Sequence, residues 1–227
     1  MSHVNWQKTI EQYRNKWCVA GVDLSSVSDL TCAVYMIPYD DDREHVDILM
    51  QTYCPEERIY DRKNKYRTQY QSWEKQGYLT ASPGNAVDYD AVRKSITDNS
   101  KVCKIGLIGI DIKFQGYDFA MRLEKDLGHT EKAPVVIACT NSAGKIGPVC
   151  QEFERRLLKR KLNHGGNPIL RFMADSVAVR APDIDGYIKP DKDKSQGKID
   201  GIVAMLYALD RLLRSQPPRK LIMPTTI

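Results

Sequence analysis

The stretch Trp17-Cys18-Val19-Ala20-Gly21-Val22-Asp23 is a short apolar run that ends in a carboxylate. An apolar run of this length predicts a buried strand. A lone Asp inside such a run is unfavourable unless it is paired or binds a cation. A second run of the same design, Lys104-Ile105-Gly106-Leu107-Ile108-Gly109-Ile110-Asp111, lies downstream, and Lys198-Ile199-Asp200-Gly201 opens the last helix-like segment. Three carboxylates, each at the edge of an apolar element, indicate a divalent-cation site.

The composition is that of a folded chain with a mild excess of positive charge. The 227 residues are 42% hydrophobic, enough for a substantial core, and the formal net charge of +5 permits a polyanionic partner without requiring one. None of the six cysteines forms a C-x-x-C pair, so we expect buried thiols in a reducing cytosol rather than a zinc site or disulfides. With no apolar signal core and no membrane-length stretch, we expect a soluble, intracellular protein.

Around the first run, the sequence predicts three strands in a row. The apolar runs are residues 17–24, 30–38 and 45–54. Short polar turns separate them, which predicts an antiparallel meander. Residues 56–77 are basic and aromatic, and we expect a helix there whose rings pack over the sheet or contact nucleic acid. Ser82-Pro83-Gly84-Asn85 marks a turn, and residues 90–99 fit a short helix.

Beyond residue 100 the pattern alternates between strands and helices. The expected elements are a strand at 104–111, a helix at 115–127, a strand at 134–139, a helix at 147–162, a strand or helix at 169–179, a hairpin at 177–190 with its turn at 183–186, and a helix at 200–214. Such alternation predicts parallel strands with crossover helices. The fold class is therefore α/β, with the element order of the ribonuclease-H-like fold. That fold has a mixed sheet, a three-strand antiparallel meander plus parallel strands, flanked by helices.

Each carboxylate also has a structural interpretation. Asp23 and Asp111 could cap turns at strand ends, and Asp200 stands where a helix N-cap is favoured. The combination favours a shared site, because this fold places the two strands side by side and brings the last helix to the same edge. Clustered carboxylates stay ionised together only if a cation neutralises them, and all-oxygen ligands favour Mg²⁺ or Mn²⁺. Two such ions about 4 Å apart can activate water and stabilise the leaving oxygen of a phosphodiester.

Two basic motifs carry weaker signals. Ala143-Gly144-Lys145-Ile146 has a Gly-Lys pair but lacks the first glycine and the Ser/Thr of a phosphate loop, so we reject it as a nucleotide-binding loop. Arg155, Arg156, Lys159 and Arg160 crowd one predicted helix. They form either a solvated face or a patch that contacts phosphates, and the sequence leaves both interpretations open.

Several collinear stretches across residues 17–210 resemble the C-terminal nuclease domain of the large terminase subunit of tailed phages. These stretches are Gly21-Val22-Asp23-Leu24-Ser25, Trp73 with Gly77-Tyr78-Leu79, Ser82-Pro83-Gly84-Asn85 with Asp88-Tyr89, Ile108-Gly109-Ile110-Asp111, Phe153-Glu154 with His164-Gly165, Asn167-Pro168-Ile169-Leu170 with Met173-Ala174, Ile188-Lys189-Pro190 and Lys198-Ile199-Asp200-Gly201-Ile202-Val203-Ala204. Their order and spacing carry the resemblance. The sequence departs from the family pattern at Ile112-Lys113-Phe114 and at Asp175, which adds a candidate fourth acid.

The resemblance implies an activity and a set of residues. Asp23, Asp111 and Asp200 would be the catalytic acids and would bind two Mg²⁺ or Mn²⁺ ions. The domain would be an endonuclease that hydrolyses double-stranded viral DNA concatemers during genome packaging and leaves 5′-phosphate and 3′-hydroxyl ends. The 177–190 hairpin resembles an element that borders the DNA path. The candidate DNA-contacting residues are Arg155, Arg156, Lys159, Arg160, Lys189 and Lys198.

The resemblance also implies a larger assembly. Residues 1–16 would be the remnant of a linker to a missing N-terminal ATPase domain, residues 17–214 the nuclease domain and residues 215–227 a flexible tail. The implied partners are double-stranded DNA, the small terminase subunit, the portal ring and the ATPase domain, in the cytoplasm of an infected bacterial host and away from any membrane. Two alternatives stay open: a junction resolvase or transposase-like nuclease of the same fold, and a non-catalytic module that docks DNA or the portal.

Overall fold

Three consecutive apolar runs pair as an antiparallel ladder in the computed structural model. The strands are β1 (Trp17–Asp23), β2 (Thr31–Pro38) and β3 (Val46–Pro55). Asp23 lies opposite Cys32 at the start of β2, and Pro38 at its other end lies opposite Val46. The predicted meander is confirmed. Its strands read as nearly continuous apolar runs because helices cover both faces of the sheet.

The structure describes residues 3–24, 30–39, 41, 43–113, 115–129, 133–140, 142–180 and 186–215. Three predictions fall partly or wholly outside these ranges: the turn after the first strand, the tip of the hairpin and the flexible tail. The base of the hairpin is described. Val179 bridges Pro190 in antiparallel fashion, and the amide of Asp191 donates to the carbonyl of Ala178.

The rest of the sheet is parallel to its neighbours. The strands are β4 (Leu79–Ser82), β5 (Lys104–Asp111), β6 (Val136–Cys139) and β7 (Leu162–Asn163). Their order is β4-β3-β2-β1-β5-β6, and β7 pairs with the start of β3. β5 is parallel to β1, so the predicted adjacency of the two acid-bearing strands is confirmed. The sequence analysis did not predict β4 and β7, because runs this short cannot be told from the turn residues around them.

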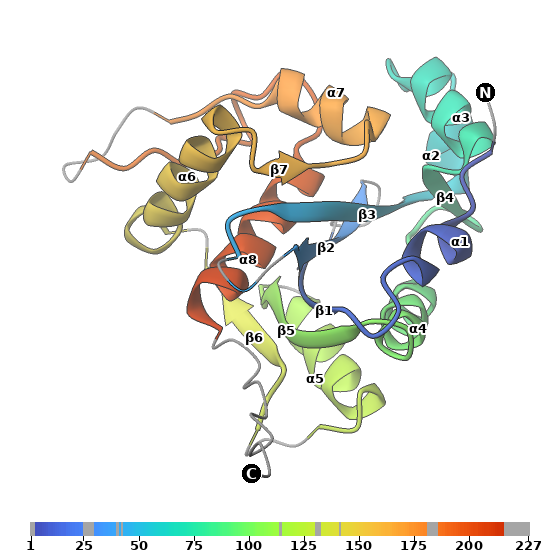
Figure 1. The fold of residues 1–227 in the computed structure, drawn as a ribbon. Helices are drawn as coiled ribbons and strands as arrows, with labels where there is room; N and C mark the ends of the chain where they lie inside the picture. Colours follow the sequence, from blue (N-terminus) through green and yellow to red (C-terminus); the bar gives the residue numbers. More distant parts are fainter. Residues whose placement is uncertain are drawn as a thin grey trace, which may run out of the picture.

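Helices form a layer on each side of the sheet (Figure 1). One layer holds α1 (Trp6–Glu11), α4 (Tyr89–Ser100) and α5 (Gly116–Asp126). The other holds α2 (Glu56–Tyr60), α3 (Arg67–Gln76), α6 (Ala143–Leu158), α7 (Pro168–Ser176) and α8 (Asp200–Arg214). Within β1, Cys18, Ala20 and Val22 face the first layer, and the alternate residues face the second. This mixed α/β architecture confirms the predicted fold class.

Two helix predictions differ in detail from the structure. The segment 56–77 breaks into two helices, because Asp61 and Asn64 turn the chain through bonds to the Lys63 amide and the Arg58 carbonyl. The helix predicted at 147–162 begins at Ala143 instead, with Pro148 inside it.

No helix in the described part of the chain is both long and apolar enough to cross a bilayer.

Candidate metal centre

β1 and β5 deliver their terminal acids to the same face of the sheet. Gly21 and Gly109 are register partners in the parallel ladder, and Asp23 and Asp111 each follow two residues later. Because side chains alternate along a strand, both acids face the layer that contains α8. The repeated Gly-x-Asp pattern of the sequence therefore becomes a pair of neighbouring carboxylates at one sheet edge.

α8 brings the third acid to this edge by lying very close to the sheet. A Cβ atom added at Gly21 would lie 2.0 Å from the carbonyl oxygen of Ala204, and one at Gly109 would lie 2.9 Å from that of Tyr207. Glycine thus removes the side chains that would keep the helix away. Asp200 is the first residue of α8, with Ile199 as N-cap, and is 6% exposed. The N-cap interpretation of Asp200 is therefore not what the structure shows.

Lys192 joins two of the acids directly. Its Nζ donates to Oδ2 of Asp23 at 2.7 Å and to Oδ1 of Asp200 at 3.1 Å. The neighbouring Asp191 is 3% exposed and pairs with Nε of Arg180 at 3.0 Å, which ties the base of the hairpin to the segment carrying Lys192. The sequence analysis missed Lys192, because one lysine in the charged stretch after residue 189 has no distinguishing pattern.

The three groups perturb one another electrostatically. Burial raises the pKa of the Asp23 carboxyl to about 7, and the charge of Asp200 raises it as well, whereas Lys192 lowers it. Burial alone would lower the pKa of Lys192, but the charges of Asp23 and Asp200 hold that pKa above its ordinary value. A single ammonium therefore does not compensate two buried carboxylates, and this edge favours additional positive charge.

Asp111 is half-buried, and its carboxylate bonds to the turn that follows β5. Its Oδ1 accepts the amide of Lys113 at 3.0 Å, which is the turn-capping arrangement expected of an Asp at a strand end. Within the described ranges, no three His, Cys, Asp or Glu side chains converge as a ready metal cage. Asp175 is exposed on α7, unlike the buried Asp23 and Asp200, which makes it the weakest of the candidate acids.

The donor set fits a hard divalent cation. Carboxylate oxygens are the ligands that Mg²⁺ and Mn²⁺ prefer. Two thiols lie near the acids, but burial raises the pKa of Cys32 well above its ordinary value and that of Cys139 to about 11. Both thiols are therefore protonated near neutral pH while no metal is bound, and they add no negative charge beside the acids. Asp23, Asp111 and Asp200 are the residues that would hold the ion.

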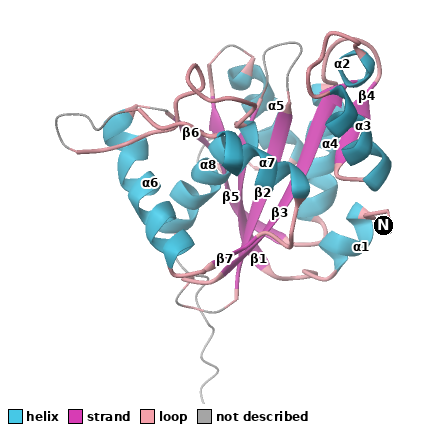
Figure 2. Ribbon diagram, turned by 90° about the horizontal axis from the view of Figure 1, so that it is seen from above, coloured by secondary structure: helices cyan, strands magenta, loops and turns pink. Residues whose placement is uncertain are grey.

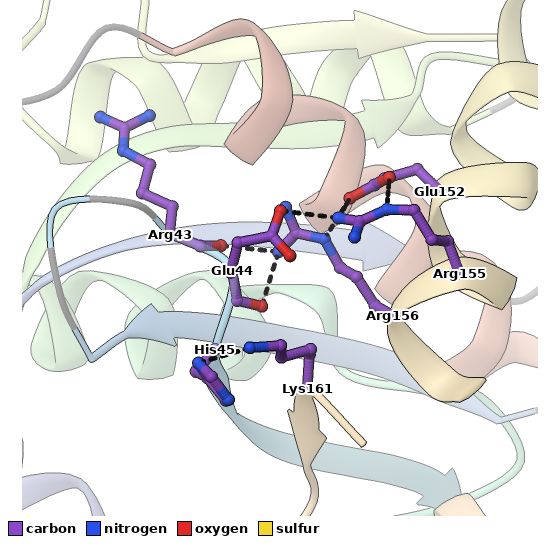
Figure 3. Close-up of polar contacts among 7 residues, drawn as sticks. All are labelled: Arg43, Glu44, His45, Glu152, Arg155, Arg156 and Lys161. Atoms are coloured by element: carbon purple, nitrogen blue, oxygen red, sulfur yellow. Dashed lines mark hydrogen bonds and ion pairs between the residues drawn. The ribbon is translucent and has the colours of Figure 1, made fainter. Parts of the chain in front are cut away.

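Two of the predicted DNA-contacting residues are engaged elsewhere (Figure 3). Arg156 is 3% exposed and donates to Glu152 and to the carbonyl of Arg43. Arg155 pairs with both Glu152 and Glu44. The structure therefore gives Arg156 a structural role, tying the end of α6 to the loop before β3, since a buried guanidinium does not face a phosphate in solvent.

The ion pairs of Arg155 and Arg156 also lie at the opposite end of the strands from the acids. Val46, just after Glu44, is opposite Pro38, whereas Asp23 is opposite Cys32 at the other end of β2. The six residue steps from Cys32 to Pro38 span about 20 Å. The exposed Lys159 and Arg160 follow α6 at that distant edge, which β7 marks in Figure 2. The partly exposed Lys189 and Lys198, close in sequence to Lys192 and Asp200, stay near the acids.

Comparison with known proteins identifies the family. The family model described as the terminase large subunit, endonuclease domain, matches residues 2–216. The chain belongs to this family. The resemblance carried by the collinear stretches across residues 17–210 is thereby confirmed, as is the association with phage terminases.

Two relatives match most of this chain. The chain is 27% identical over 223 residues to Protein YmfN of Escherichia coli K12, covering 92% of this chain and 48% of that protein. It is 30% identical over 194 residues to the terminase large subunit of Enterobacteria phage HK97, covering 84% of this chain and 36% of that protein. This terminase nuclease chain thus spans about half or less of the relatives it matches.

Solved terminase structures share the fold. The crystal structure of the HK97 bacteriophage large terminase superposes with a TM-score of 0.74 at 25% identity, covering 92% of this chain and 43% of that one. The large terminase nuclease from thermophilic phage G20c with bound magnesium has a TM-score of 0.50 at 11% identity, covering 87% and 85%. At that identity the second likeness speaks only for the fold.

Proposed function

We propose that this chain is a divalent-metal-dependent DNA endonuclease, with Asp23, Asp111 and Asp200 as its metal-binding catalytic acids. One observation carries the proposal. Carboxylates from β1 and α8 already share a cation, the ammonium of Lys192, and Asp111 ends the strand next to Asp23. An edge that binds one cation between acids from distant segments is suited to bind another. The magnesium bound by the G20c terminase nuclease supports the same chemistry.

The chain's own groups have distinct roles in this proposal. Asp23 lies centrally, between Asp200 and Asp111, and so is suited to share two ions. Asp200 is fixed by the buried helix that it begins. When bound, two Mg²⁺ or Mn²⁺ ions would activate the attacking water and neutralise charge on the phosphodiester. Lys192 would yield carboxylate oxygens to the metal while keeping positive charge beside the phosphate.

The biological substrate follows from the family rather than from the site. We propose that the domain cuts double-stranded viral DNA concatemers during packaging, in the cytoplasm of an infected bacterium, and leaves 5′-phosphate and 3′-hydroxyl ends. In the whole protein it would act with an ATPase domain, a small terminase subunit and a portal ring. Residues 1–16 would then connect it to the ATPase domain. The match to part of the HK97 terminase large subunit supports these proposals.

A plasmid assay tests the activity. The parent chain should nick and linearise supercoiled plasmid with Mn²⁺ or Mg²⁺ and should be inert in EDTA. Asp23→Asn should lower the rate at least about 100-fold, because it removes a charged ligand and leaves a side chain of the same shape. Asp175→Asn is the matched control and should cut like the parent. An Asp23→Asn chain that cuts at the parental rate would rule out this assignment.

Two further comparisons separate the rival functions. Strong preference for four-way junctions over linear duplex would assign the chain to the resolvase type. If calorimetry finds no Mn²⁺ binding at millimolar concentration and plasmid stays intact, the chain is a docking module rather than a nuclease.

A further inference from the structure

A polar cavity of about 300 Å³ lies where the N-terminal end of α6 meets the end of β6 and the second half of α8. The residues that matter for its chemistry are Thr140, Gly144, Lys145, Asp210, Arg211 and Arg214. The Gly-Lys pair, which does not form a nucleotide-binding loop, thus stands in the first turn of a 16-residue helix. None of these six residues belongs to the metal centre.

The cavity lies at the same end of the parallel strands as the acids. Cys139, which lines the cavity, is the register partner of Asp111 on β5. The adjacent strand spacing is about 5 Å, so the cavity begins one strand beyond the acids. α8 links the two places: Asp200 begins it at the metal centre and Arg211 lies eleven residues later, about 16 Å along the axis. A polymer that crosses the metal centre along this edge would reach the cavity.

The charges in the cavity favour an anion. Lys145, Arg211 and Arg214 supply three positive charges, and the carboxylate of Asp210 supplies one negative charge. Asp210 is already paired, since Arg211 and Arg214 both donate to it. The N-terminus of α6 adds its partial positive charge, and the N-cap, Ser142, makes no side-chain capping bond to the first turn.

A second, independent feature points to a ligand. Arg211 lines the cavity and is only 8% exposed, and its Nε is a buried donor with no hydrogen-bond partner in the described part of the chain. Buried donors are nearly always satisfied in native proteins. Arg211 therefore keeps one hydrogen-bond donor unused beside the cavity, and an anion bound there would neutralise the charge excess.

We propose that this cavity binds a backbone phosphate of DNA, displaced along the same edge from the phosphate that is cut. The inference rests on the proposed function for its choice of polymer, but binding at the cavity does not require cleavage. Bound here, a phosphate would receive donors from the first turn of α6, from Lys145 and from Arg211. The contact would fix the strand's path relative to Asp111 and would be independent of base sequence.

Gly144→Glu tests the proposal with little risk to the fold. A Cβ atom at Gly144 meets no atom within 4 Å, and a carboxylate in the first turn of a helix is stabilising. The new charge would occupy the cavity and repel a phosphate. In EDTA, the affinity of the 227-residue chain for a short fluorescent duplex should fall roughly three- to tenfold at ~0.1 M salt. Lys145→Ala should lower the slope of log affinity against log salt by about 0.9.

The matched control is Gln151→Glu. It changes the net charge by the same amount on an exposed position of the same helix, and it should bind DNA like the parent. If Gly144→Glu and Gln151→Glu bind DNA equally well, the cavity is not a DNA-phosphate site. The same holds if inorganic phosphate raises the parental Tm but not that of Gly144→Glu while their DNA affinities agree, because the cavity then holds a free anion.

Failure of the nuclease proposal has a different signature. If the parent binds duplex and Gly144→Glu weakens that binding, the phosphate site stands even when no plasmid is cut. If plasmid is cut and all variants bind the duplex with equal affinity, the nuclease proposal is supported and the phosphate site is excluded.

Discussion

Gly21 of β1 and Gly109 of β5 lie directly opposite each other, and both face the backbone of α8. Each precedes a catalytic candidate, Asp23 or Asp111, by two residues. The pair therefore sets the depth at which α8 packs, and this depth places Asp200 beside Asp23. Packing and the candidate site depend on the same two positions.

Gly21→Ala should be severely destabilising. Its Cβ would lie 2.0 Å from the carbonyl oxygen of Ala204 and 2.5 Å from the amide of Ala208, and both are backbone atoms of a buried helix that cannot rotate away. We expect a loss of about 3 kcal/mol or more in urea unfolding. Gly144→Ala is the control, since nothing lies within 4 Å, and it should gain about 0.5–1 kcal/mol. Equal stability of the two variants would contradict this account.

How much the sequence could predict depends on how local each signal was. The apolar runs were enough to place Asp23 and Asp111 at strand ends, because such runs are local signals. The pairing of their strands came from the element order and the fold that it resembles. Lys192 could not be predicted, since it acts through contacts 169 and 8 residues away along the chain. Arg156 was misleading for the same reason: its partners in the loop before β3 lie more than a hundred residues away.

Lys192→Ala should strengthen the effect of Mn²⁺ on stability. Without its ammonium, Asp23 and Asp200 repel each other, so the metal-free chain should lose roughly 1–3 kcal/mol. A divalent ion then meets no competing cation, and the rise in Tm with millimolar Mn²⁺ should exceed the parental rise. Lys194→Ala, an exposed position nearby, should shift like the parent. Identical Mn²⁺ responses in the parent and Lys192→Ala would show that the lysine does not compete.

Ile10→Ala tests whether the N-terminal segment belongs to the domain. Ile10 is fully buried, and Nε1 of Trp6 donates to Asn99 of α4 at 3.0 Å. The substitution should lower the unfolding free energy by about 2–4 kcal/mol, because it leaves a cavity. Lys8→Ala, which is exposed, should have almost no effect. Were residues 1–16 only a linker, both variants would unfold like the parent.

Glu152 should contribute to stability in a defined pH window. Hydrogen bonds from Arg155 and Arg156 lower the pKa of its carboxyl to about 2, from an ordinary value of 4.5. A pKa depressed in the folded state gives stability that is complete above about pH 4.5 and is lost as pH falls toward 2. Urea unfolding from pH 7 to pH 3 should therefore show a flatter acid dependence in Glu152→Gln than in the parent. Lys159→Ala should keep the parental dependence, and a parental slope in Glu152→Gln would exclude this role.

The two edges of the sheet should differ in their contact with DNA. Lys198 is two residues from Asp200, and Lys189 lies at the base of the hairpin near Lys192, whereas Lys159 is at the opposite edge beyond α6. Anisotropy with a short duplex in EDTA should show roughly threefold weaker binding for Lys198→Ala and Lys189→Ala, each with a salt slope reduced by about 0.9. Lys159→Ala should bind like the parent. If Lys159→Ala is the variant that loses affinity, the duplex lies along the edge of Glu44 and Arg155, and the three acids are not where DNA is cut.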